Sequence, residues 1–145
     1  MNPTISDAQI ARIEDAVRDA ERRTSGEVRV HIEENRPAGR EALARAIEVF
    51  HALAMHRTEQ RNGVLFYVAT ETRNFAVIGD AGIDAVVPPG FWDGVRDRVL
   101  ADFRHGRYAE GLVAGLALAG EQLARYFPYD AATDQNELPD TVSQG

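Results

Sequence analysis

Acidic residues and glycines are concentrated in one short segment of this sequence, Gly79–Asp80–Ala81–Gly82–Ile83–Asp84. Its two carboxylates stand four positions apart, and its glycines allow the backbone to curve tightly. Hard cations such as calcium take roughly six to eight oxygen ligands, from carboxylates and from loop carbonyls. The segment therefore predicts a site for a divalent cation, although the ligand spacing of an EF-hand is missing.

The same two aspartates have a simpler interpretation. Aspartate is among the preferred residues at helix N-termini, so Asp80 or Asp84 can cap a short helix that begins in this segment. The sequence alone leaves both interpretations open.

Glu27 is a further candidate ligand because of the way the strands are expected to pair. If the strand that ends at Gly79 runs antiparallel to the one before it, its end lies beside the start of the first strand. Glu27 stands at that start and would approach Asp80. Its alternative role is an exposed charge at a strand entry. With Asp93 added, the predicted metal ligands are Glu27, Asp80, Asp84 and Asp93.

Nucleophilic and thiol chemistry are not favoured. The chain has no cysteine, and all 16 of its basic residues are arginines, which excludes thiolate metal sites and catalytic lysines. None of the three serines lies in a nucleophile elbow or has an evident histidine partner. The histidines lack metal-ligand spacing, and we expect all four to be solvated: 31, 51, 56 and 105.

Length and charge limit the class of protein. A chain of 145 residues is the size of one domain and can form its own core. Its net charge of −7 repels phosphate backbones, so we expect no nucleic-acid partner. The N-terminus lacks the apolar run of a secretory signal, and no segment is apolar over the length of a membrane span. We therefore expect a cytoplasmic protein.

Helices and strands must position the candidate ligands. A capping box, Ser6 with Gln9, predicts a first helix. Alternation in residues 28–33 predicts a half-buried strand, and the apolar run 64–69 predicts a strand buried on both faces. Between them, a second amphipathic helix places Leu43, Ile47, Phe50 and Leu53 on one stripe. Residues 75–78 read as a third strand, and helices follow at 91–103 and 107–126.

The order of these elements predicts how the strands pair. A strand, a helix and a second strand form a right-handed parallel unit. The loop before the third strand is too short for a crossover, so that strand turns back antiparallel. The sequence therefore predicts a mixed sheet in one domain, residues 1–128, followed by an acidic C-terminal tail, residues 129–145.

Several short motifs together resemble the TPM domain. Their order and spacing run from residue 5 to about residue 128: Ile5–Ser6–Asp7, Thr24–Ser25–Gly26–Glu27–Val28, Arg61–Asn62–Gly63–Val64–Leu65, Ile78–Gly79–Asp80–Ala81–Gly82–Ile83, and Phe103–Arg104–His105–Gly106–Arg107–Tyr108 before Gly111–Leu112. The pair Trp92–Asp93 and the closing Tyr126–Phe127–Pro128 look like the small stand-alone bacterial members.

The resemblance implies an α/β fold, a three-layer α/β/α sandwich with a mixed sheet flanked by helices. In several members it implies binding of divalent cations such as calcium in a surface crevice. Acid phosphatase activity is described for some plant members and is not general. The membrane-tethered members carry a signal peptide and an anchor that this chain lacks, so their roles are not carried over.

Three functions follow from these observations. The first is a stand-alone, non-enzymatic binding or adaptor module that holds a divalent cation, calcium or alternatively magnesium. The second is a metal-dependent acid phosphatase acting on phosphomonoesters, in which the ion activates water and Arg61 clamps the phosphate. The third is a scaffold for an unknown protein partner, with Trp92 as an anchor if it is exposed.

Overall fold

The protein is described here by a computed structural model that covers residues 5–35, 41–58, 60–72, 74–129 and 142–144. Its helices are α1 (Asp7–Glu21), α2 (Ala42–Ala52), the 3-10 turn η1 (Met55–Arg57), α3 (Ala81–Asp84), α4 (Phe91–Phe103) and α5 (Tyr108–Tyr126). Its strands are β1 (Glu27–Glu33), β2 (Gly63–Ala69), β3 (Asn74–Gly79) and β4 (Ser143–Gln144).

These strands form one mixed sheet in the order β3-β2-β1-β4. β1 and β2 are parallel, joined through α2, and β3 returns antiparallel to β2. Both pairings agree with the sequence prediction. The short strand β4, near the end of the chain, pairs with the other side of β1. The predicted tail thus contributes a strand, whereas residues 130–141 and 145 lie outside the described residues.

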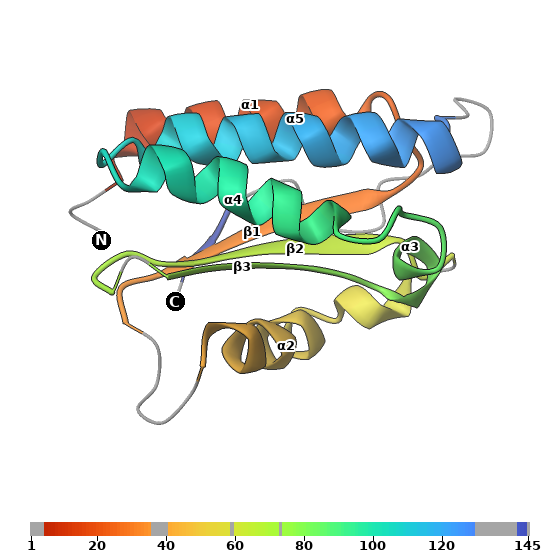
Figure 1. Ribbon diagram of the computed structural model, residues 1–145, viewed down its shortest axis with the longest axis horizontal. Coiled ribbons are helices and arrows are strands. Elements are labelled where there is room, and N and C mark those ends of the chain that lie inside the picture. Colours follow the sequence, from red (N-terminus) through yellow and green to blue (C-terminus); the bar gives the residue numbers. More distant parts are fainter. Residues whose placement is uncertain (1–4, 36–40, 59, 73, 130–141, 145) are drawn as a thin grey trace.

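Helices cover both faces of the sheet, which confirms the predicted three-layer α/β/α fold (Figure 1). α1, α4 and α5 form the layer on one face, over a core that includes Val28, Phe66 and Val77. α2 covers the opposite face, over a smaller core that includes Leu65, Tyr67 and Ala76. The alternation of side chains along each strand divides these residues between the two cores.

The α2 side of the sheet differs from one expectation drawn from the sequence. The polar face of β1 is not solvated, because Glu27, His31 and Glu33 are buried, and Glu33 pairs with Arg45 of α2. The apolar stripe of α2 is only partly buried. Phe50 enters the core, but Leu43 and Ile47 remain 55% and 46% exposed.

Candidate functional site

Asp80 immediately follows β3 and performs the capping role that the sequence allowed. Its side chain accepts a hydrogen bond from the N–H of Ala81 at the start of α3, at 2.8 Å. Its two carboxylate oxygens also accept hydrogen bonds from the Arg61 guanidinium, at 2.8 and 2.9 Å. Asp80 is 7% exposed, so this carboxylate is buried, capped and paired. The pairing with Arg61 raises the pKa of that guanidinium.

Asp84 lies one helical turn after Asp80, at the end of α3. Its Oδ1 accepts a hydrogen bond from the indole N–H of Trp92, at 2.8 Å. The Trp92 ring packs against Gly79, where an added Cβ would lie 2.6 Å from the ring. Gly79 is therefore required to let the start of α4 approach the end of β3. This contact brings Asp84 to the residues around Asp93.

A groove of about 630 Å³ runs along β3 between α2 and α4. Three of the four predicted ligands line it: Asp80, Asp84 and Asp93. Asp93 is an exposed residue in the first turn of α4, with Arg96 at 3.5 Å. Asp84 and Asp93 also line a smaller depression of about 370 Å³ beside the loop before α4. The structure thus collects these three carboxylates around one end of the groove.

Glu27 lies at the same end of the sheet but not in this groove. It opens β1 opposite Gly63 of β2, whose C=O accepts a hydrogen bond from the N–H of Asp80. Glu27 is thus two strand spacings from Asp80, roughly 10 Å between backbones. The carbonyl of Met55 packs over Gly63 between them, 3.1 Å from where a Cβ would stand. Glu27 is 2% exposed, so it is not an exposed strand-entry charge.

The side chains as they stand do not form a complete metal centre. Within the part of the chain that the structure describes, no group of three or more acidic or histidine side chains is arranged to hold a metal ion. The Arg61 guanidinium occupies the oxygens of Asp80 that a cation would need. The sequence showed the acidic segment but not this partner, because the pairing depends on the hairpin and on the left-handed backbone of Arg61, with φ of 53°.

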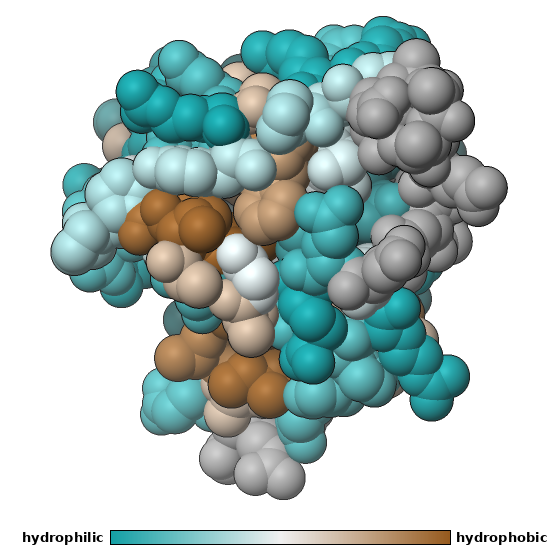
Figure 2. Space-filling model, turned by 90° about the vertical axis from the view of Figure 1, so that its right-hand side faces the viewer, coloured by the Kyte–Doolittle hydropathy of each residue, from teal (hydrophilic) through white to brown (hydrophobic). Residues whose placement is uncertain are grey.

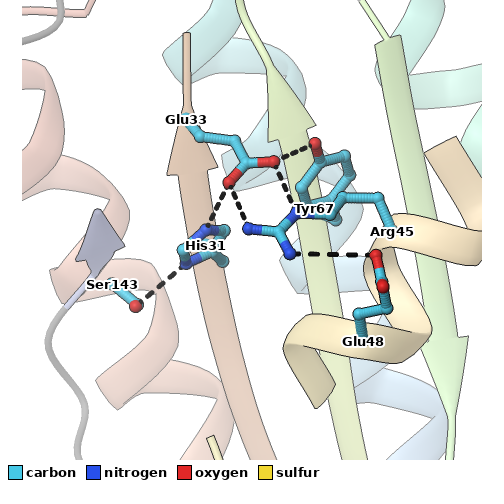
Figure 3. A network of polar contacts seen from close by, with 6 residues as sticks. All are labelled: His31, Glu33, Arg45, Glu48, Tyr67 and Ser143. Atoms are coloured by element: carbon cyan, nitrogen blue, oxygen red, sulfur yellow. Dashed lines mark hydrogen bonds and ion pairs between the residues drawn. The ribbon is translucent and has the colours of Figure 1, made fainter. Parts of the chain in front are cut away.

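A second polar cluster lies on the polar face of β1, which the sequence analysis expected to be solvated (Figure 3). Glu33 accepts hydrogen bonds from Arg45 of α2, both at 3.0 Å, and from the buried hydroxyl of Tyr67. His31 contacts Glu33 through Nε2, at 3.2 Å, and the hydroxyl of Ser143 through Nδ1, at 2.9 Å. Ser143 therefore has a histidine partner, contrary to the sequence expectation, and the contact joins β4 to β1.

Burial and hydrogen bonding shift the pKa values of Glu33 and His31 in opposite directions. Burial raises the pKa of Glu33, but the hydrogen bonds from Arg45, Tyr67 and His31 outweigh it and hold that pKa at about 2. Burial lowers the pKa of His31, and the hydrogen bond to Glu33 only partly offsets this effect. The cluster is thus a carboxylate ion-paired to Arg45 beside a neutral histidine, which suits a structural connection between α2, β1 and β4.

The fold and the acidic end of the groove define an α/β domain with candidate cation ligands on its surface. A family model for the TPM domain matches residues 2–122. The chain therefore belongs to the TPM domain family. No curated protein matches the chain.

Solved structures agree with this assignment. The BA42 protein from the psychrophilic bacterium Bizionia argentinensis is 44% identical, with a TM-score of 0.88, over 97% of this chain and 95% of that one. The N-terminal domain of a P. gingivalis protein shares the fold at 21% identity and a TM-score of 0.67, over 86% and 80%. The N-terminal domain of cg2496 from Corynebacterium glutamicum shares the fold at 12% identity and a TM-score of 0.59, over 97% of this chain and 81% of that one.

Proposed function

We propose that this protein is a non-enzymatic module that binds a divalent cation, calcium in preference to magnesium, at the acidic end of the β3 groove. The proposal rests chiefly on one observation: Asp93 of α4 lines the same end of one groove as Asp80 and Asp84 of the α3 turn. Carboxylate oxygens are the donors that hard cations prefer. Calcium is favoured over magnesium because it tolerates irregular ligand geometry.

The donor set fits a cation if Arg61 leaves Asp80. The Arg61 side chain is 53% exposed, so it can move into water while Asp80 keeps its hydrogen bond to Ala81. In this proposal Asp80 and Asp84 would hold the ion, and Asp93 would complete the site from α4. The cation and the guanidinium would then compete for one carboxylate. Binding is expected to be weaker than at a preformed site, because Arg61 must be displaced.

Glu27 is a further candidate ligand, because it lies at the same end of the sheet as the three aspartates. Its carboxylate would join the site only if the ligands extended past Gly63. The oxygen Oδ1 of Asn62, also at this end of the sheet, is buried and accepts no hydrogen bond from the described residues. A weaker calcium affinity in Glu27→Gln would show that the site reaches across this region, whereas an unchanged affinity would confine it to the groove.

A calcium titration followed by backbone amide chemical shifts tests the proposal. We expect saturable shifts centred on residues 79–84 and on the first turn of α4. Asp93→Asn should weaken binding. Asp97→Asn is its matched control, because Asp97 is also about 3.5 Å from Arg96 and equally exposed but does not line the groove. Equal effects of the two substitutions, or no saturable shift below millimolar calcium, would contradict the proposal.

The phosphatase alternative has less support from the same residues. Arg61 was its expected phosphate clamp, but both of its paired nitrogens face Asp80. A phosphate would have to displace that carboxylate. Turnover of p-nitrophenyl phosphate that requires a divalent cation and is lost in Asp84→Asn would favour this alternative. We expect no such turnover.

A further inference from the structure

The two edges of the described sheet are formed by different kinds of strand. β4 pairs with β1 at one edge, whereas β3 forms the other edge of the described sheet. The N–H of Asp80 bonds to the C=O of Gly63, which fixes the alternation of the antiparallel ladder. By that alternation Phe75, Val77 and Gly79 direct their backbone N–H and C=O groups away from β2. These groups face the groove rather than another strand.

The walls of the groove are apolar on both sides of this edge. Leu43 and Ile47 of α2, both strongly exposed, line one wall, and Trp92 of α4 stands on the other. Figure 2 shows hydrophobic surface above and below the narrow waist of the molecule, between the upper helical layer and the α2 lobe. An added strand in this position would place alternate side chains against the two walls, because successive side chains point to opposite faces.

The charges around the groove are mainly acidic. Its lining includes Glu41 before the start of α2 and Asp84 and Asp93 near the end of β3. Arg96 and His51 are the basic side chains among the lining residues. α2 and β3 run in the same direction (Figure 1), so Glu41 and the two aspartates lie toward opposite ends of the groove. A ligand that complements this surface is apolar in the middle and basic at its ends.

We propose that the open edge of β3 binds an extended segment of a partner protein by adding it to the sheet as a further strand. The segment has alternating apolar residues and carries lysine or arginine at both ends. Backbone hydrogen bonds along residues 75–79 supply affinity, and the apolar walls and acidic ends supply specificity. A second copy of this chain is a poorer occupant, because two acidic grooves would face each other.

A synthetic peptide tests this proposal in calcium-free buffer with a chelator, so that the result does not depend on cation binding. The peptide has seven residues, with valine at the three even positions, lysine or arginine at the ends and threonine between the valines. We expect saturable amide shifts confined to residues 75–79 and to the parts of α2 and α4 that face them. Affinity should fall as sodium chloride is added, because the end charges are screened.

Two comparisons separate strand addition from simple apolar or ionic adhesion. Ile47→Ser should weaken binding roughly fivefold to tenfold, since it removes apolar contact area. Leu118→Ser, on exposed α5 surface outside the groove, should leave binding unchanged. Two N-methylated peptides complete the comparison. One is methylated at the valines and the other at the residues between them. Only one of the two should lose binding, because methylation blocks the backbone N–H groups on one edge of the strand and not on the other.

Several results would overturn the proposal. Equal binding of both N-methylated peptides would exclude strand pairing. Shifts centred on β1 or β4, or no saturable shift, would exclude this edge as the site. Concentration-dependent dimerisation that shifts residues 75–79 without any peptide would assign the edge to a second copy. If the peptide binds but calcium does not, only the cation proposal is wrong. If calcium binds but the peptide does not, only the peptide proposal is wrong.

Discussion

Arg61 controls the chemistry available to Asp80. Its guanidinium satisfies both oxygens of that buried carboxylate, so the acidic segment is neutralised from within the chain. Both hydrogen bonds are charge-assisted and bidentate, which lets the guanidinium compete with a weakly held cation. The sequence showed the two aspartates and their capping role, but the Arg61 partner depends on tertiary structure.

The variant Arg61→Asn tests this competition. Asparagine tolerates the left-handed backbone at position 61 and removes the guanidinium. We expect calcium affinity to rise by roughly tenfold in calorimetry, since the cation no longer displaces an ion pair. An unchanged or lower affinity would mean that Arg61 does not compete with the ion.

The Glu33 cluster makes a second prediction, on the dependence of stability on pH. Because the folded-state pKa of Glu33 is about 2, below its ordinary 4.5, its contribution is full above pH 4.5 and is lost toward pH 2. The lowered pKa of His31 acts in the same direction, since stability falls as pH drops below its ordinary 6.5. The free energy of unfolding should therefore fall in both acidic ranges.

Urea unfolding of Glu33→Gln separates this cluster from other carboxylates. We expect a loss on the order of 2–3 kcal/mol at pH 7, which narrows as pH falls from 4.5 towards 2, because the parent's Glu33 is then protonated in the unfolded chain before it is in the folded one. Glu48→Gln is the control, because Glu48 is an exposed and more distant partner of Arg45, at 3.8 Å. Its cost should stay below about 1 kcal/mol. A loss in Glu33→Gln that is independent of pH would contradict this account.

At the scale of elements, glycines decide how closely α4 and α5 approach. A Cβ at Gly115 would lie 2.6 Å from Val99 Cγ2 and 3.0 Å from Phe66 Cε2, so α5 packs on α4 and β2 through that position. Gly94, in the first turn of α4, has no packing neighbour within 4 Å of the same position among the described residues. One glycine is a packing requirement, and the other only weakens its helix.

The two alanine substitutions should therefore change the free energy of unfolding in opposite directions. Gly115→Ala is expected to lower the free energy of unfolding by about 1–3 kcal/mol through overpacking. Gly94→Ala is expected to raise it by about 0.5–1 kcal/mol through helix propensity. Thermal or chemical unfolding measures both. A stabilising Gly115→Ala would show that α4 and α5 can separate without cost.

The bounds of helices and strands were predicted better than the burial of their faces. The helices at 91–103 and 107–126 and the three long strands follow from local periodicity, and the structure has them within about one or two residues. Periodicity does not say what covers a face. The polar side of β1 was expected in water, but its Glu27, His31 and Glu33 are buried. The α2 stripe at Leu43 and Ile47 was not distinguished from its buried neighbours.

At the scale of the molecule, the chain is an α/β/α sandwich of the TPM family, and among the described residues β4 and β3 form the two edges of its sheet. The parallel crossover and the hairpin could be predicted because chain connections permit few alternatives. The pairing of β4 could not, since its two residues carry no strand pattern. Among the described residues, no helix combines the length and apolar character that a membrane crossing needs.

The melting temperature in calcium and in chelator tests the cation proposal most directly. A ligand present at a hundredfold excess over its Kd stabilises the folded state by about 2.7 kcal/mol, which raises Tm by roughly 5–12 °C in domains near this size. We predict such a rise for the parent and for Asp97→Asn, and a smaller one for Asp80→Asn, Asp84→Asn and Asp93→Asn. If the parent and all of these variants melt at temperatures that calcium does not change, the groove does not bind the ion.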